Sequence, residues 1–311
     1  MNYIMNTENK CIFVSSRGIL NSCMFHSYKP ISSIHRLIEY NFTDVERDEG
    51  YDKCYSVYVC LSAIKEFMNI INALPFRFVL VTGDCDESCY EDVLTNLMFE
   101  KLINHPKLVH WFSQNCVYEH EKLTKIPIGL DYHTISNNMH HSWGPNQSPL
   151  DQERDLILLK SRSPPFYERT IKAYANYHFF MTTRYGMDRV DAKKSIPENL
   201  VFYEPSKVPR IQTWANQVQY SFVISPHGNG FDCHRTWEAL LLGCIPIMKK
   251  SRIDSLFKDL PVLIVNDWSD VTQELLDATI IEFKQKHDNN EFNYEKLLLD
   301  YWMKLIHDKC V

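Results

Sequence analysis

Short apolar runs alternate with longer amphipathic stretches along the first half of this chain. Runs of this length are typical of buried strands, whereas apolar residues three and four apart predict helices. The predicted strands are residues 11–15, 77–82 and 108–112, and the predicted helices between them are residues 63–74 and 91–103. This order predicts an α/β domain with a parallel sheet.

The second half repeats the alternation after a polar segment, residues 133–151, that is rich in turn-forming residues. We interpret this segment as the connection between two domains. Beyond it, the predicted strands are residues 155–160, 200–203, 221–225 and 261–265, and the predicted helices are residues 167–177 and 210–219. The closing stretch, residues 281–310, has apolar residues near helical spacing and predicts further helices.

One segment, residues 221–248, places a buried strand, a glycine turn, a charged helix and a second strand in succession. Gly228 and Gly230 carry no side-chain bulk, so we expect backbone amides of the turn to approach a ligand closely. The helix that follows points the positive end of its dipole at the same turn. The segment therefore predicts a phosphate-binding site.

The helix in this segment is expected to begin with Asp232 as its N-cap and to end at Gly243. Arg235 and Glu238 lie three residues apart and share one face. An arginine near a helix N-terminus suits a diphosphate, and a carboxylate one turn deeper suits the paired hydroxyls of a ribose. The alternative is a surface ion pair on an ordinary amphipathic helix.

The sequence of residues 222–248 resembles the C-terminal nucleotide-sugar-binding segment of exostosin-like glycosyltransferases. The shared elements are a strand, a Pro-x-Gly turn, an Arg-x-x-Glu helix and a Gly-Cys-Ile-Pro strand. A shorter stretch, residues 125–131, resembles the Pro-x-Gly element that closes the first domain of related enzymes. The resemblance implies that Glu238 holds the ribose and Arg235 the diphosphate of a UDP-sugar.

The resemblance also implies the GT-B form of the α/β class, in which two Rossmann-like domains face each other across a cleft. On this interpretation, residues 1–145 form an acceptor-side domain and residues 152–282 form the nucleotide-sugar-binding domain. Residues 283–311 form C-terminal helices that return to the first domain and pack on it.

Further donor contacts are expected in the glycine turn and after the predicted strand at 155–160. Lys160 and Arg162 would follow that strand and neutralise the leaving diphosphate. The predicted donor-binding residues are Ser225, Gly228, Asn229, Gly230, Arg235, Glu238, Lys160 and Arg162. The UDP-sugar donor is the one small molecule implied, with no metal and no resident cofactor.

Transfer of a sugar with inversion requires a base that takes the proton from the acceptor hydroxyl. Ligands of open parallel sheets bind beyond the carboxyl ends of the strands, where Asp84 and Asp86 follow the strand at 77–82. Asp84 is the first candidate for the catalytic base, Asp86 the second and His227 the third. Two alternatives remain open: the acidic loop caps the next helix, or the two aspartates hold a divalent ion in a single-domain transferase.

The composition indicates which binding partners and which cellular compartment to expect. The formal charge of −6 argues against a general nucleic-acid binder, for which a basic stripe is expected. Ten cysteines scattered through 311 residues favour free thiols in a reducing compartment. Polar and charged positions throughout residues 1–20 fit neither a leader nor a membrane anchor, a departure from animal exostosins. These features predict a cytoplasmic protein without a membrane span.

Residues and resemblance together predict an inverting, metal-independent glycosyltransferase. It would move a sugar of the xylose, glucuronic acid or galactose class from a UDP-sugar to a hydroxyl of an oligosaccharide or a glycoprotein glycan. Two other classes remain open: a carbohydrate-binding or scaffold protein without turnover, and a dinucleotide-dependent oxidoreductase. The missing G-x-G-x-x-G motif counts against the oxidoreductase.

Overall fold

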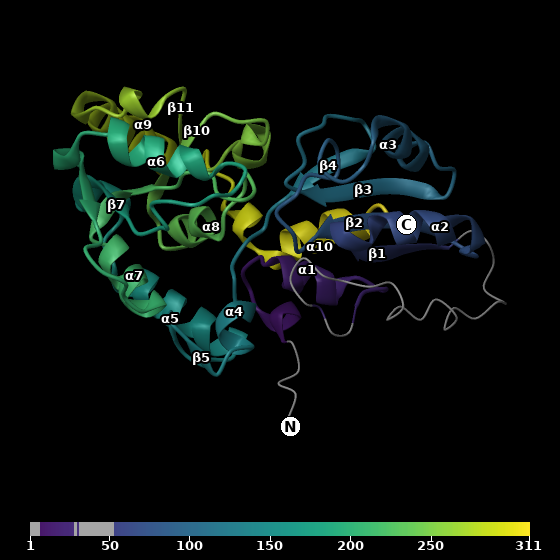
Figure 1. Ribbon diagram of the computed structural model, residues 1–311. Coiled ribbons are helices and arrows are strands. Elements are labelled where there is room, and N and C mark those ends of the chain that lie inside the picture. Colours follow the sequence, from purple (N-terminus) through teal and green to yellow (C-terminus); the bar gives the residue numbers. More distant parts are fainter. Residues whose placement is uncertain (1–6, 28–29, 31–52) are drawn as a thin grey trace. The chain divides into compact units, whose positions relative to one another are not determined.

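The computed structural model describes residues 7–27, 30 and 53–311, which form two compact units (Figure 1). The four-stranded unit contains the described residues of Glu8–Ile128 together with Leu298–Val311. The five-stranded unit contains Gly129–Leu297, with Thr7 added. Both units carry a parallel sheet and helices, which confirms the predicted α/β class. The first six residues, part of the stretch in which no leader is predicted, lie outside the described residues.

The sheet of the four-stranded unit has the order β1-β2-β3-β4, and all its neighbouring strands are parallel. Its strands are β1 (Cys54–Cys60), β2 (Arg77–Gly83), β3 (Leu108–Gln114) and β4 (Leu123–Ile126). Its helices are α1 (Ser16–Ser22), α2 (Ile64–Ile70), α3 (Asn96–Ile103) and α10 (Leu299–His307). The predicted strands at 77–82 and 108–112 are confirmed, whereas β1 and β4 were not predicted.

The strand predicted at residues 11–15 is wrong. The run contains isolated bridges instead of a strand, among them Phe13 with Leu298, and α1 begins directly after Ser15. The hydroxyl of Ser15 accepts the N–H of Gly18 at 2.9 Å, so the end of the apolar run serves as a helix N-cap instead of continuing as a strand.

The closing helix α10 belongs to the four-stranded unit. The N–H of Leu299 donates to the carbonyl oxygen of Ile12 at 2.9 Å, and α10 packs beside α1. Trp302, Met303 and Ile306 bury the apolar face of the helix. The four-stranded unit is therefore built from two segments of the chain, one before and one after the main segment of the five-stranded unit.

The sheet of the five-stranded unit has the order β11-β10-β9-β7-β8, again with parallel neighbours. Its strands are β7 (Thr170–Ala175), β8 (Val201–Tyr203), β9 (Tyr220–Ile224), β10 (Ile245–Lys249) and β11 (Leu263–Val265). The chain builds β8 on one side of β7 and then returns to build β9, β10 and β11 on the other side. The order of the strands therefore reverses between β7 and β9, the position where open α/β sheets bind ligands.

Helices and a small hairpin complete the five-stranded unit. The helices are α4 (His133–Ser136), α5 (Pro149–Arg162), α6 (Gly186–Ser195), α7 (Arg210–Gln217), α8 (His234–Leu241) and α9 (Gln273–Asp288). The hairpin strands are β5 (His140–His141) and β6 (Gly144–Pro145). The segment 133–151, interpreted from the sequence as a connection, thus carries α4, the hairpin and the start of α5, and all of it lies in this unit.

Two predicted elements of the second half are exchanged in the structure. Residues 155–160 lie within α5, not in a strand, because Ser148 caps the helix and Pro149 occupies its first turn. Residues 167–177, predicted as a helix, contain strand β7 instead. Lys160 and Arg162 consequently lie in the last turn of a helix and not at a strand end.

Helix α8 follows the prediction closely. Its N-cap is Cys233 and not Asp232, whose carboxylate instead accepts the indole N–H of Trp237 at 2.8 Å. Its end at Gly243 is confirmed, because that glycine has a φ of +74°. The buried guanidinium of Arg169 donates to the carbonyl oxygen of Leu242 at 2.9 Å and closes the helix C-terminus.

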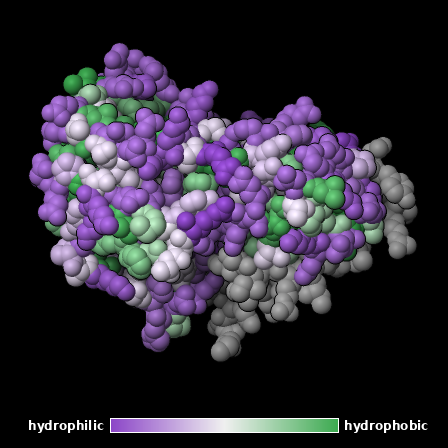
Figure 2. All heavy atoms as spheres, turned by 45° about the horizontal axis from the view of Figure 1, so that its top comes forward, coloured by the Kyte–Doolittle hydropathy of each residue, from purple (hydrophilic) through white to green (hydrophobic). Residues whose placement is uncertain are grey.

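Hydrophilic residues cover most of the face shown in Figure 2, and hydrophobic residues form small groups between them. In the described ranges, none of the helices combines the length and apolar character needed to cross a membrane. All ten cysteines lie in the described ranges, and none of them forms a disulfide.

Candidate functional site

The loops that follow β7 and β9 meet at the reversal of strand order in the five-stranded unit. Arg189 of α6 joins them: its Nε donates to the carbonyl oxygen of His227 at 3.0 Å and its Nη1 to that of His178 at 3.4 Å. The arginine is 7% exposed. A cation is therefore fixed by backbone contacts at the position where ligands of such sheets bind.

Gly228 leaves room for the guanidinium of this arginine. A Cβ atom at residue 228 would lie 2.5 Å from Nη2 of Arg189, closer than side-chain carbons approach other atoms. The N–H of Gly228 donates to the carbonyl oxygen of Gly230 at 3.0 Å. The prediction that this turn frees its amides for a ligand is thus wrong for Gly228, whose small size admits a guanidinium and whose amide is used inside the turn.

A second cation, Arg235, lies on the first turn of α8. Its Nη1 donates to the hydroxyl of Ser225 at 3.4 Å and to the carbonyl oxygen of Pro226 at 3.3 Å, and its guanidinium carbon lies 5.2 Å from the ring centre of Tyr177. Tyr177 follows β7 and Ser225 follows β9, so this side chain also spans the reversal of strand order. The hydroxyl of Ser225 is further hydrogen-bonded to that of Thr236 at 2.8 Å.

The two arginines form a site of positive charge. Burial and the charge of Arg235 lower the pKa of Arg189. The pKa of His178 is lowered by burial and then by Arg189, Lys207 and Arg235. Among the residues that the structure describes, neither Arg189 nor Arg235 forms an ion pair with a carboxylate. An anion placed here would meet two positive side chains and the positive end of α8.

His227 lies in this turn but is committed to the backbone. Its Nδ1 lies 2.9 Å from the carbonyl oxygen of Phe231 and its Nε2 lies 3.2 Å from that of Lys249. Its own N–H donates to a carboxylate oxygen of Asp188 at 2.9 Å. Both ring nitrogens therefore face backbone carbonyl oxygens, and neither is directed at a substrate. Asn229 and Gly230 follow in the same turn.

Glu238 and Arg235 share a helix but not their partners. One oxygen of Glu238 accepts the Nε–H of Arg210 at 3.1 Å, forming an ion pair in which the side chains are 13% and 6% exposed. Burial alone would lower the pKa of Arg210, but Glu238 and Asp131 raise it above its usual value. The carboxylate predicted to hold a ribose is therefore engaged by an arginine that the sequence did not single out.

A buried carboxylate and two histidines lie beside that ion pair. Asp131 is 3.2 Å from Nδ1 of His133 and accepts the N–H of Thr134 at 2.9 Å. Burial would raise the pKa of Asp131, but His133, His234, Arg210 and the bond from Thr134 hold it far below the usual carboxyl range.

His234 has a defined orientation at the start of α8. Its Nδ1 lies 2.7 Å from the carbonyl oxygen of Gly129, so Nδ1 carries the hydrogen and donates a hydrogen bond to that oxygen. In the neutral ring this leaves the lone pair on Nε2. A proton acceptor thus lies next to Arg235 in the chain.

The predicted base Asp84 lies in the other unit, at the carboxyl end of β2. It has a φ of +53°, unusual for a residue with a side chain, and its N–H donates to the hydroxyl of Ser16 at 3.0 Å. Its carboxylate pairs with Arg17 at 3.5 Å, and both side chains are almost completely buried. Asp86 follows in the same loop and is half-buried. Within the described ranges, no group of three His, Cys, Asp or Glu side chains is arranged to hold a metal ion.

Lys160 and Arg162 are exposed at the end of α5. No contact of either residue with Arg189 or Arg235 is found. The structure brings Ser225, Gly228 and Arg235 together at one site and places Glu238 one turn away, against Arg210.

Sequence reasoning missed Arg189, Arg210 and His234. Arg189 and Arg210 lie in helices without a recognisable motif, and their positions depend on packing against distant loops. His234 carried a signal, because it directly precedes the motif arginine at the start of α8.

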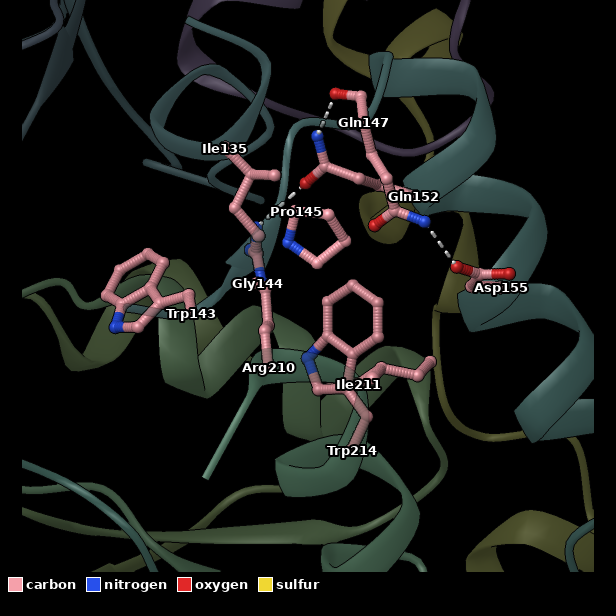
Figure 3. Close-up of a pocket in the computed structure, with 10 residues that line it drawn as sticks. All are labelled: Ile135, Trp143, Gly144, Pro145, Gln147, Gln152, Asp155, Arg210, Ile211 and Trp214. Carbon is pink, nitrogen blue, oxygen red and sulfur yellow. Dashed lines mark hydrogen bonds between the residues drawn. The ribbon is translucent and has the colours of Figure 1, made fainter. Parts of the chain in front are cut away.

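A small pocket lies beside Arg210 (Figure 3). It is formed by α5, α7 and the β5–β6 hairpin, and its volume is about 80 Å³. Arg210 lies in its wall and connects it to Glu238 on α8.

No protein-family model matches the chain, and no curated protein is significantly similar to it in sequence.

Proposed function

We propose that the protein is a glycosyltransferase that binds the diphosphate of a nucleotide sugar between the loops after β7 and β9. The observation that carries the proposal is the pair of arginines, Arg189 and Arg235, at the reversal of strand order in a parallel sheet. Both lack a carboxylate partner among the described residues, so a diphosphate supplies the charge that the site lacks. The resemblance of residues 222–248 to the exostosin segment supports a sugar nucleotide, and UDP is the nucleotide it favours.

The proposal includes the GT-B arrangement, in which one domain binds the donor and the other binds the acceptor. The five-stranded unit would bind the donor, and the four-stranded unit would contribute to the acceptor side. The acceptor would be a hydroxyl of an oligosaccharide or a glycoprotein glycan, and the donor sugar would be of the xylose, glucuronic acid or galactose class.

We infer that His234 takes the proton from the acceptor hydroxyl. As the acceptor oxygen bonds to the sugar carbon, the bond between that carbon and the diphosphate breaks, and the proton passes to Nε2 of His234. Arg189 and Arg235 stabilise the negative charge on the departing diphosphate. The hydrogen bond to Gly129 supports this role because it holds Nδ1 as the donor and Nε2 as the acceptor.

Calorimetry with UDP and uridine tests the donor site. Arg235→Ala should weaken UDP binding by about 1.5–3 kcal/mol, the usual range for a hydrogen bond to a charged group, and leave uridine binding nearly unchanged. Arg154→Ala, which removes an exposed arginine of α5, is the matched control. Equal UDP affinity in the parent and Arg235→Ala would contradict the proposal. Binding of UDP without hydrolysis or transfer from any UDP-sugar would favour the carbohydrate-binding alternative.

A further inference from the structure

Two cysteines of the four-stranded unit meet where strand β1 begins and the chain ends. The sulfur of Cys54, the first residue of β1, lies 3.9 Å from the carbonyl oxygen of Lys309, the residue directly before Cys310. Cys310 lies against the last turn of α10, because its N–H donates to the carbonyl oxygen of His307 at 2.8 Å and its sulfur lies 3.5 Å from that of Ile306. A hydrogen bond joins the side chains of the two cysteines.

Solvent access distinguishes this pair from the other hydrogen-bonded cysteines of the unit. Cys54 and Cys310 are both partly exposed. Two further pairs consist of residues that are at most 5% exposed: Cys60 with Cys85, and Cys89 with Cys116. A thiol reacts with a dissolved oxidant only where that oxidant can reach the sulfur. Cys54 and Cys310 are therefore the accessible pair.

The surroundings of Cys54 favour its thiolate. The hydrogen bond from Cys310 is the largest influence and lowers the pKa of Cys54, against the effect of burial. The charge of Arg77, which lies opposite Cys54 in the pairing of β1 with β2, lowers this pKa further. The same hydrogen bond raises the pKa of Cys310, and burial raises that of Cys23 to about 12. Cys54 is thus the nucleophile, and Cys310 is the thiol that can react after it.

We propose that Cys54 and Cys310 form a reversible disulfide when the protein meets a peroxide. The Cys54 thiolate attacks one oxygen of hydrogen peroxide, the O–O bond breaks, and the products are a sulfenic acid and a hydroxide that combines with the proton released by Cys54. The sulfur of Cys310 then attacks the sulfenic sulfur, the S–O bond breaks, and the departing hydroxide takes the Cys310 proton and leaves as water. The peroxide gains the two electrons that the thiols lose. A small dithiol or glutathione reverses the reaction by thiol–disulfide exchange.

The disulfide fastens the end of the chain to the sheet of the four-stranded unit. Cys54 begins β1 and Cys310 follows α10, so the bond joins the two segments of this unit that the five-stranded unit separates in the sequence. In the reduced protein, noncovalent contacts hold α10 in place, and the helix can detach by local opening. The crosslink suppresses this opening. The inference stands whether or not the protein transfers sugar.

Peptide mapping of the full chain tests the proposal. The reduced protein is treated with hydrogen peroxide, its remaining thiols are blocked with iodoacetamide in urea, and it is digested without a reductant. Mass spectrometry should find a peptide in which Cys54 is joined to Cys310, and the buried cysteine pairs should carry the blocking group. The mass of the intact chain before blocking should fall by two hydrogens and return to its original value with dithiothreitol. Hydrogen exchange in α10 should be slower in the oxidised protein than in the reduced protein.

Three variants separate the two steps of the reaction. Cys310→Ser should stop it at the sulfenic acid of Cys54, so dimedone should label Cys54 several-fold more strongly than in the parent. Cys54→Ser should leave Cys310 as a thiol. Cys233→Ser removes a partly exposed cysteine of the five-stranded unit and is the matched control, which should form the same crosslink as the parent.

Four results would overturn the proposal. They are the absence of a peptide that joins Cys54 to Cys310, a crosslink between two chains in its place, equal dimedone labelling of Cys54 in the parent and in Cys310→Ser, and unchanged hydrogen exchange of α10 on oxidation. The first two are measured on the parent protein, so they decide the question even if a variant fails to fold.

Discussion

Asp131 shows how a single buried carboxylate depends on its surroundings. It keeps its charge because His133, His234 and Arg210 surround it, and without them burial would favour the neutral acid. The residue therefore links the histidines to the Arg210–Glu238 ion pair.

The lowered pKa gives Asp131→Asn a pH-dependent effect on stability. A group whose folded-state pKa lies below its unfolded value of about 4 stabilises the fold above that pH and loses this contribution as the pH falls. At pH 7 we expect Asp131→Asn to lower the free energy of unfolding by about 1–3 kcal/mol, with the deficit shrinking below pH 4. Urea unfolding between pH 3 and 7 measures it, with Asp277→Asn as the control. A deficit that is constant with pH would show that the charge of Asp131 is not the cause.

The two candidate bases make opposite predictions. His234→Gln should reduce turnover about a hundredfold or more and leave UDP binding intact, because only the proton acceptor is lost. Asp84→Asn should lower the stability of the four-stranded unit, since it breaks a buried pair with Arg17, and the folded fraction should keep its turnover. Transfer assays, UDP calorimetry and thermal unfolding of the two variants show whether His234 or Asp84 is the base. A folded Asp84→Asn protein that binds UDP but is inactive would return the role to Asp84.

The motif residues of the candidate site could be located from the sequence, but their partners could not. Arg235 was predicted beside a turn because helix geometry and the glycines lie within a few residues of each other. Glu238 pairs with Arg210, which lies 28 residues earlier in the chain. Gly228 lies against Arg189, which is 39 residues earlier. No local pattern reports such contacts.

At the scale of elements, helix α8 joins the site to the sheet, and its C-terminus is fixed by Gly243 and Arg169. Gly243→Ala places a side chain at a φ of +74°, and the new Cβ would lie 3.3 Å from Nη2 of Arg169. We expect a loss of about 1–2 kcal/mol in the free energy of unfolding, measured by urea titration. Gly243→Asn should cost less because asparagine tolerates this conformation. If Gly243→Ala and Gly243→Asn lowered the free energy of unfolding equally, the cause would be the contact with Arg169 and not the backbone conformation.

The exchanged assignments of α5 and β7 show where local patterns fail. The apolar run in residues 155–160 is typical of a buried strand, yet Ile157 and Leu158 are 40% and 43% exposed on the outside of a helix. The capping residue Ser148 and Pro149 gave the correct signal for α5, seven residues earlier. In contrast, β2, β3 and β9 were predictable because a buried parallel strand is apolar on both faces.

At the scale of the whole molecule, the α/β class followed from the alternation of elements, but the membership of the closing helix depends on long-range packing. Trp302 is buried in the four-stranded unit, 4% exposed. Trp302→Ala should lower the stability of that unit by about 3–5 kcal/mol. Hydrogen exchange resolved by mass spectrometry should show faster exchange in β1–β4 and unchanged exchange in β7–β11. Equal acceleration in both sheets would mean that the two units unfold together.

The return of α10 to the four-stranded unit has a consequence for biosynthesis. A ribosome produces β1–β4 first, yet the segment whose Leu299, Trp302 and Ile306 complete that unit emerges only after all of Gly129–Leu297. The five-stranded unit, made almost entirely of one continuous stretch, can fold as soon as it leaves the exit tunnel. Of the two units, the one whose strands are translated earlier is thus completed later, and during that interval its uncovered apolar surface is a natural target for chaperones.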